Sequence, residues 1–185
     1  LLPAPTFAEY AAALETVIVT YSGFFCGRKN DFAVTDGFVD AIDDSTDAVF
    51  LCQPNNPTGQ LTALPLVEQI PTLRGVGTLL VVDECFLDFL PDHALHTAKG
   101  LLGEGDLVIL KAFTKLYGMA GVRLGYALSA DTALLEQMQA CGQPWGVSSL
   151  AQAAGLAALE ETAYVEKVRA LIAEQRPRLT AGLRA

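Results

Sequence analysis

Short apolar runs that alternate with amphipathic segments constrain this chain more than any other feature of its sequence. The runs at residues 79–82 and 107–110 are four residues long, and half of their side chains are β-branched. A membrane-spanning helix needs about 20 apolar residues, so neither run can cross a bilayer. Runs of this kind are typical of strands that are buried on both faces of a parallel sheet.

Strand and helix patterns alternate along the whole chain. Strands are expected at residues 17–21, 48–52, 78–82, 106–110 and 122–128. Helices are expected at residues 6–15, 35–42, 62–73, 131–141, 148–159 and 163–183. Thr35 and Thr62 are expected to be N-caps, and Pro177 is expected to interrupt or kink the last helix. The alternation predicts an α/β fold, in which a mostly parallel sheet is the middle of three αβα layers.

Composition and charge exclude several classes of protein. Of the 185 residues, 51% are apolar and 18% are charged, which excludes an intrinsically disordered chain. The formal net charge is −9, so the chain lacks the basic surface with which nucleic-acid-binding proteins contact phosphates. The same charge disfavours binding to an anionic membrane surface. We therefore expect neither a nucleic acid nor a membrane among the partners.

Cysteine and histidine positions give no pattern of metal ligands. The chain has four cysteines, which are Cys26, Cys52, Cys85 and Cys141. They form no CxxC pair and match no zinc framework, so we expect reduced thiols in a cytosolic, cytoplasmic protein. No carboxylate-rich frame surrounds His93 and His96, and both are expected to lie at the surface.

Polar residues follow three of the expected strands at the point where each strand ends. Asn56 lies in a turn after the strand at 48–52, Asp83 follows the strand at 78–82, and Lys115 follows the strand at 106–110. In open α/β sheets, ligands bind beyond the carboxyl ends of the strands. The three side chains are therefore expected to share one site.

Lys115 has the surroundings of a reactive amine. Its loop is apolar and rich in glycine, and desolvation of a lysine favours the neutral amine, which can condense with an aldehyde. Arg123, eight residues further on, offers a guanidinium fork for a phosphate. Taken singly, each residue also has a plainer explanation: Lys115 as a solvated lysine, Arg123 as a surface arginine, Asp83 as a helix N-cap and Asn56 as part of a turn.

Four motifs in a fixed order are more specific than any of these residues alone. They are Asn-Asn-Pro-Thr-Gly at 55–59, Val-Val-Asp-Glu at 81–84, Thr-Lys at 114–115 and Gly-x-Arg-x-Gly-Tyr at 121–126. In this order, the motifs resemble the class I/II aminotransferase family, whose members are fold-type I enzymes dependent on pyridoxal 5′-phosphate (PLP). The resemblance covers nearly the whole chain.

The resemblance implies roles for the polar residues at the strand ends. Lys115 matches the family's Schiff-base lysine, which also transfers protons as general acid and base. Asp83 matches the aspartate that pairs with the protonated pyridine nitrogen of PLP and keeps the ring an electron sink. Asn56 matches the residue that hydrogen-bonds the 3-oxygen of the ring. No metal ion is implied.

Further cofactor contacts are implied elsewhere, together with two departures from the family pattern. Thr114 and Arg123 match phosphate contacts, and Phe7 matches the aromatic residue stacked on the ring. Phe86 stands where the family usually has a tyrosine that bonds the 3-oxygen. Ala112 replaces a serine or threonine that usually binds phosphate.

The departure at Phe86 indicates a branch of the family. The segments 83–91 and 143–148 look closer to L-threonine-O-3-phosphate decarboxylase, an enzyme of cobalamin biosynthesis, than to the alternative, histidinol-phosphate aminotransferase. Either activity implies a small, phosphorylated amino-acid substrate. A catalytically inactive regulator with the same fold is the non-enzyme alternative. A nicotinamide-binding Rossmann enzyme is disfavoured, because no GxGxxG motif follows a strand.

The resemblance also implies a domain organisation. Residues 1–162 are expected to form a PLP-binding large domain that lacks its N-terminal segment. Residues 163–185 are expected to form a helix that leads toward a missing small C-terminal domain. The chain is thus expected to be the central fragment of a homodimeric enzyme, and to be inactive in isolation.

Overall fold

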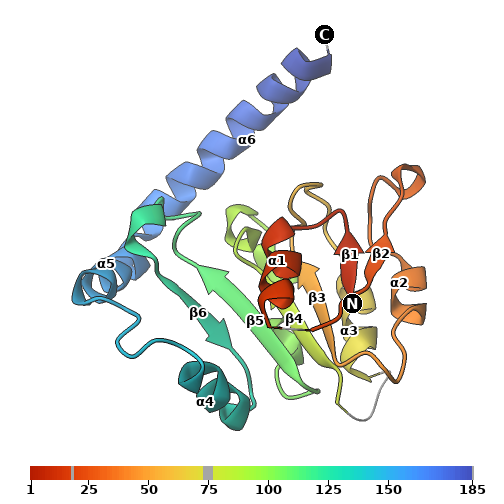
Figure 1. Cartoon of the computed structure of the whole chain (residues 1–185). Helices are drawn as coiled ribbons and strands as arrows, with labels where there is room; N and C mark the ends of the chain where they lie inside the picture. The colour runs from red at the N-terminus through yellow and green to blue at the C-terminus, as the bar shows by residue number, and fades with distance from the viewer. Residues whose placement is uncertain (18, 73–76, 185) are drawn as a thin grey trace.

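The computed structural model describes residues 1–17, 19–72 and 77–184, and it has an α/β fold (Figure 1). The strands are β1 (Leu2–Ala4), β2 (Gly23–Phe25), β3 (Ala48–Cys52), β4 (Leu79–Asp83), β5 (Leu107–Ala112) and β6 (Gly125–Leu128). The helices are α1 (Ala8–Thr16), α2 (Asp36–Asp40), α3 (Leu64–Thr72), α4 (Thr132–Ala140), α5 (Ser149–Glu160) and α6 (Thr162–Arg184). Short 3₁₀ helices are η1 (Arg28–Asn30), η2 (Leu87–Phe89), η3 (His93–Leu95), η4 (Ala98–Leu101) and η5 (Ala120–Val122).

The main sheet is mostly parallel, as the sequence predicts. Its order is β3-β4-β5-β6, in which β3, β4 and β5 are parallel and β6 is antiparallel to β5. A smaller parallel sheet pairs β1 with β2, and the amino group of Leu1 donates to the carbonyl of Ala48 over 2.7 Å. Because β3, β4 and β5 run in one direction, the loops that follow them meet at one edge of the sheet.

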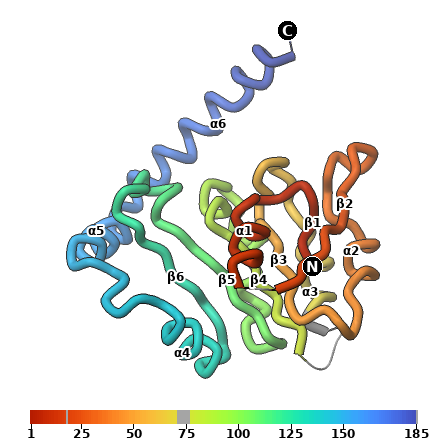
Figure 2. Tube along the Cα trace, viewed as in Figure 1, coloured from red at the N-terminus to blue at the C-terminus, as the bar shows by residue number. Residues whose placement is uncertain are grey.

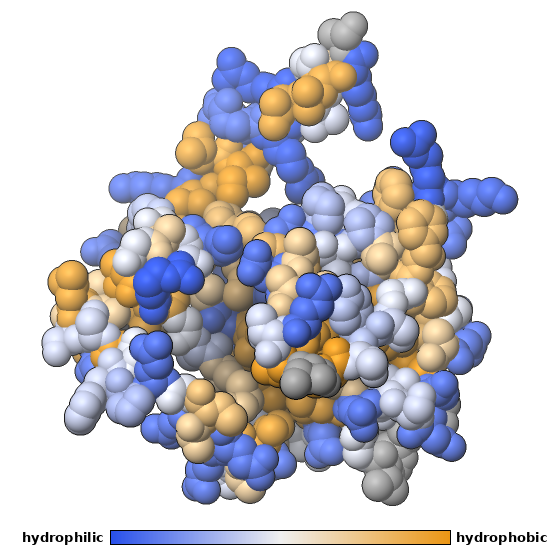
Figure 3. All heavy atoms as spheres, viewed as in Figure 1, coloured by the Kyte–Doolittle hydropathy of each residue, from blue (hydrophilic) through white to orange (hydrophobic). Residues whose placement is uncertain are grey.

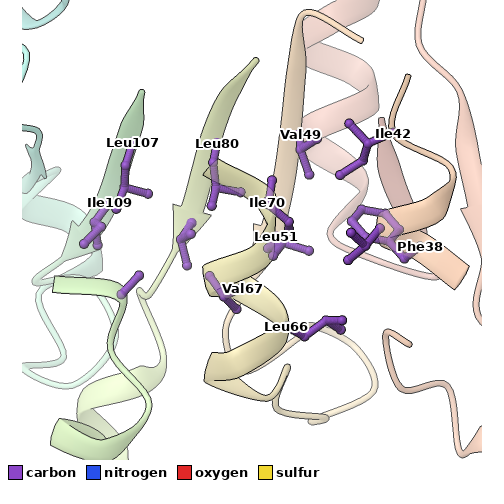
Figure 4. Packing of buried hydrophobic residues seen from close by; sticks show 13 residues of the cluster. Phe38, Ile42, Val49, Leu51, Leu66, Val67, Ile70, Leu80, Leu107 and Ile109 are labelled. Carbon is purple, nitrogen blue, oxygen red and sulfur yellow. The ribbon is translucent and has the colours of Figure 1, made fainter. Parts of the chain in front are cut away.

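Alternating side chains of the strands give the sheet two packed faces. On one face, Leu51, Leu80 and Ile109 are buried in a cluster with residues of α2 and α3 (Figure 4). On the other face, Cys52 and Phe50 pack against Tyr10 of α1. Figure 1 shows α1 in front of the sheet and α3 behind it, which confirms helical layers on both sides.

The strand expected at 17–21 is wrong. Val17 is the C-cap of α1, residues 19–21 belong to no strand, and Ile18 lies outside the described residues. The second strand begins instead at Gly23. The side chains of Val19 and Tyr21 are exposed, and β-branched or aromatic residues favour a strand mainly where one face packs against neighbours.

Of the two expected threonine caps, Thr35 is found at the N-cap position of α2 and Thr62 is not an N-cap of α3. The helix α3 begins at Leu64, and Thr62 is held instead by the Gln53 side chain, which bonds both its N–H and its carbonyl over 2.8 Å. Thr35 does precede α2 directly, but its side chain makes no cap hydrogen bond. The end of α3 expected near residue 73 lies outside the described residues.

The last helix, α6, has 23 residues and passes through Pro177 without a break. The proline leaves the carbonyl of Ala173 without its helical N–H partner, and Ala173 is exposed, so water can hydrate that carbonyl. Figure 2 shows α6 leaving the body of the fold, with the C-terminus at its far end and the N-terminus in the body. No helix in the described part of the chain is both long enough and apolar enough to cross a bilayer.

Replacing Leu80 by alanine should test the core directly. Leu80 is 0% exposed, and removing such a side chain leaves a cavity that costs about 2–5 kcal/mol of stability. Leu95→Ala is the matched control, because Leu95 is 71% exposed and its loss should cost less than about 0.5 kcal/mol. Equal unfolding free energies for the two variants in a urea titration would contradict the packing described.

Candidate functional site

Asp83 ends β4 at the carboxyl edge of the sheet, and both of its carboxylate oxygens have a donor. The hydroxyl of Tyr10 donates to Oδ2 over 2.6 Å, and the backbone N–H of Cys85 donates to Oδ1 over 2.9 Å. Burial raises the pKa of Tyr10, and the hydrogen bond to Asp83 raises it further, so the hydroxyl remains a donor at neutral pH. The orientation of the carboxylate is therefore fixed by two elements distant in sequence.

Tyr10 is a site residue that the sequence analysis missed. It lies on α1 three residues after Phe7, and the two rings meet edge to face with their centroids 5.4 Å apart. The available signal was a hydroxyl-bearing ring on the same helical face as Phe7. Through Tyr10, the half-exposed ring of Phe7 is connected to Asp83.

The Asn-Asn-Pro-Thr-Gly loop holds its two asparagines in different surroundings. Asn55 is buried: it accepts a hydrogen bond from Thr6 Oγ1 over 2.7 Å, and it donates to the carbonyl of Pro5 and to Thr58 Oγ1 over 2.9 Å. Asn56 is partly exposed and lines a cavity of about 320 Å³. Among the described residues, no side chain or backbone group hydrogen-bonds its carboxamide. Asn55 thus fixes the loop, and Asn56 is left available for a ligand.

Lys115 is exposed, and its Nζ lies 5.1 Å from the ring centroid of Phe86, at the distance of a cation–π contact. The desolvated amine expected from the apolar loop is therefore not what the structure shows. Phe86 directly follows Cys85, whose N–H binds Asp83. Burial raises the pKa of the Cys85 thiol, and its hydrogen bond with Asp83 adds to that effect, so the thiol stays neutral beside the carboxylate.

A buried ion pair lies directly behind this site, and the sequence analysis also missed it. Lys111 Nζ is 3.0 Å from Glu84 Oε2 and 3.0 Å from Asp88 Oδ1. Burial lowers the pKa of Lys111, but the two carboxylates outweigh burial and hold the pKa above its ordinary value. Glu84 also accepts hydrogen bonds from the Thr97 hydroxyl and the Ala98 N–H. A lysine inside a run of buried strand residues was the signal.

The two expected phosphate contacts, Thr114 and Arg123, lie on the β5–β6 connection that also carries Lys115. Arg123 is exposed, has a left-handed φ of 57°, and donates from Nη1 to the carbonyl of Ala120 over 3.0 Å. Thr114 follows Phe113, whose N–H donates over 3.1 Å to the carbonyl of Leu124, the residue after Arg123. Within the described residues, neither side chain has a hydrogen bond or an ion pair with Asp83, Asn56 or Lys115.

Glycine is required where β6 begins beside β5. A Cβ on Gly125 would lie 2.8 Å from the carbonyl oxygen of Lys111, closer than real Cβ atoms approach. The glycine therefore permits the close pairing that places Arg123 beside the loop of Lys115.

The groups that the structure gathers are chemically unlike one another. Phe7, Asp83 and Lys115 are joined by successive contacts, and the cavity beside Phe86 adds Asn56. An amine, a fixed carboxylate, a carboxamide and an aromatic face suit a planar heteroaromatic aldehyde such as PLP. No cluster of three or more metal-ligating side chains occurs in the described ranges 1–17, 19–72 and 77–184.

Comparisons with known proteins identify the family of the chain. The family model for class I and II aminotransferases matches residues 1–185. Threonine-phosphate decarboxylase of Salmonella typhimurium is 33% identical over 165 residues, which is 89% of this chain and 45% of that protein. Histidinol-phosphate aminotransferase of Lactiplantibacillus plantarum is 34% identical over 171 residues, which is 90% of this chain and 47% of that protein.

A solved structure shares the fold. Histidinol-phosphate aminotransferase from Sinorhizobium meliloti, crystallised in complex with PLP, superposes with a TM-score of 0.85 at 24% identity, over 97% of this chain and 48% of that one. The chain thus spans about half the length of the relatives that it matches.

Replacing Lys111 by glutamine should destabilise the protein strongly. The change leaves the fully buried carboxylate of Glu84 without its cation, and breaking a buried ion pair costs about 3–5 kcal/mol. Lys115→Gln, the same change four residues along at an exposed position, should alter stability by less than about 0.5 kcal/mol. Chemical denaturation followed by circular dichroism measures both, and a stable Lys111→Gln protein would show that the pair is not needed for folding.

Proposed function

The chain belongs to the class I and II aminotransferase family, and from that premise we propose that it is the central part of a PLP-dependent enzyme that acts on a small, phosphorylated amino acid. The observation that carries the proposal is the Asp83 carboxylate, fixed by Tyr10 and Cys85 and joined through Phe86 to the exposed amine of Lys115. Family members are PLP enzymes, and the donor set of this site suits the same cofactor.

Each site residue has a task in this proposal. PLP, when bound, supplies an aldehyde and an electron-withdrawing ring. Lys115 anchors the cofactor covalently and moves protons at the Cα atom of the substrate. Asp83 holds a proton on the ring nitrogen, Asn56 donates to the 3-oxygen, and Phe7 covers the ring face.

The remaining residues support binding rather than chemistry. Thr114 and Arg123 bind the phosphate, and the hydroxyl of Tyr10 keeps the carboxylate of Asp83 aimed at the ring nitrogen. Phe86 has no hydroxyl to donate to the 3-oxygen of the ring, so Asn56 is the sole donor proposed for that oxygen within the described residues.

We favour decarboxylation of L-threonine O-3-phosphate as the reaction, in cobalamin biosynthesis. Phe86 and the similarity to the Salmonella decarboxylase support it. The aminotransferase of histidinol phosphate is the second candidate, supported by a relative of similar identity, 34% against 33%. Assaying the full-length protein with both phosphorylated substrates separates the candidates: the first releases carbon dioxide, and the second forms a carbonyl product and converts the acceptor keto acid to an amino acid.

The proposal includes the architecture of the whole protein. Residues 1–162 form the PLP-binding domain, and residues 163–185 connect it to a second domain, in a homodimer. The 185-residue chain alone is proposed to be inactive, since it lacks about half the length of its relatives.

Lys115→Ala should abolish covalent attachment of PLP and leave the fold intact, because the side chain is exposed. The measurement is peptide mass spectrometry after borohydride reduction of the PLP-treated full-length protein, with circular dichroism as the test of folding. Lys99→Ala, at another exposed lysine, is the control and should keep the modified Lys115 peptide. PLP fixed to a different lysine in the unaltered protein would refute the assignment and favour an inactive relative.

Asp83→Asn should reduce turnover far more than PLP affinity. The amide cannot stabilise a proton on the ring nitrogen, and a lost electrostatic contact of this kind costs about 10²–10³ in rate. Asp92→Asn, at an exposed aspartate, serves as the control. If rate and affinity fall equally, Asp83 only positions the ring.

A further inference from the structure

A cavity of about 320 Å³ lies between the candidate site and α6, and the proposed function does not use it fully. The loop at 54–59 forms one wall, with Asn56 on it. Phe86 and Phe89 form an apolar side, and Ile172 and Arg176 of α6 also line the cavity. The volume lies at the lower end of the range for small-molecule sites, which is about 300–1,000 Å³.

Arg176 differs from the two neighbouring arginines of α6 in its partners. Arg169 pairs with Glu166 over 3.0 Å, and Arg178 pairs with Glu174 over 3.5 Å. Within the described residues, the guanidinium of Arg176 has no hydrogen bond and no ion pair. It therefore lines the cavity as a cation without a counter-ion, in a chain whose net charge is −9.

A contact earlier in α6 holds the helix against the body of the fold. Arg169 donates from Nε and Nη2 to the carbonyl of Asp88 over 3.0 and 2.9 Å, which ties α6 to the segment after β4. Arg176 follows seven residues later, about two helical turns, so it lies on the same side of α6. Figure 3 shows hydrophobic and hydrophilic side chains side by side along α6, and Ile172 and Arg176 present one of each kind to the cavity.

We propose that this cavity is the subsite for an anionic group of the substrate, with Arg176 as its cation and Asn56 as its hydrogen-bond donor. The inference rests on the proposed function and names the substrate contact within it. A guanidinium fork matches the oxygens of a carboxylate or a phosphate, and charge-assisted hydrogen bonds of this kind are about twice as strong as neutral ones. The apolar side formed by Phe86 and Phe89 accommodates the carbon skeleton.

The test is isothermal titration calorimetry of the full-length protein without PLP, titrated with O-phospho-L-threonine, L-threonine and inorganic phosphate. Arg176→Gln should weaken binding of O-phospho-L-threonine by about tenfold or more, as expected for one lost charge-assisted contact. Arg178→Gln is the matched control, because it removes the same charge two residues away, outside the cavity, and should change the affinity less than about twofold. The unfolding temperatures of both variants should match that of the unaltered protein.

The three ligands identify the anionic group. If Arg176→Gln also weakens inorganic phosphate but not L-threonine, Arg176 binds the phosphate; the reverse pattern assigns it to the carboxylate, and both patterns support the subsite. Equal affinities for Arg176→Gln and Arg178→Gln with all three ligands would overturn it. Borohydride fixation of PLP to Lys115 is measured separately, so the subsite and the proposed function can fail independently.

Discussion

The candidate site depends on the buried ion pair between Lys111 and Glu84. An isolated charge in a protein interior is very unfavourable, so neither residue tolerates separation from the other. Glu84 directly follows Asp83, and Lys111 lies four residues before Lys115, so the pair links the two segments that carry the chemical groups. The N–H of Glu84 also donates to the carbonyl of Leu110 over 2.9 Å, which continues the β4–β5 ladder to the edge of the site.

Near that pair, residues that hold the structure in place stand close in sequence to residues that are free to bind a ligand. The carboxamide of Asn55 is hydrogen-bonded to Thr6, Pro5 and Thr58, whereas the carboxamide of Asn56 is available for a ligand. Likewise, Lys111 is buried and paired, whereas Lys115 is exposed on the following loop. A site is preorganised for its ligand when the residues that bind the ligand are supported by residues whose own positions are fixed.

The sequence predicted those parts of the fold that depend on local pattern. The strands β3, β4 and β5 were predictable because buried runs with β-branched residues have few alternatives. The contact between Tyr10 and Asp83 joins residues 73 positions apart, and no local pattern reports it. The strand expected at 17–21 failed for a related reason: strand propensity depends on a packed face, and packing is decided by distant parts of the chain.

The contacts that hold α6 have a mechanical consequence, because Tyr164, which stacks on Tyr117, and Arg169 both lie in the first half of the helix. Arg169 is tied to the carbonyl of Asp88, and Arg176 lies about 10 Å further along the helix at a rise of 1.5 Å per residue. A rotation of the helix about Arg169 would therefore displace the residues further along it. A tilt of about 10° would move Arg176 by roughly 2 Å on that rise, enough to make or break a hydrogen bond. Because Arg176 and Asn56 line the same cavity, such a tilt would change the width of that cavity.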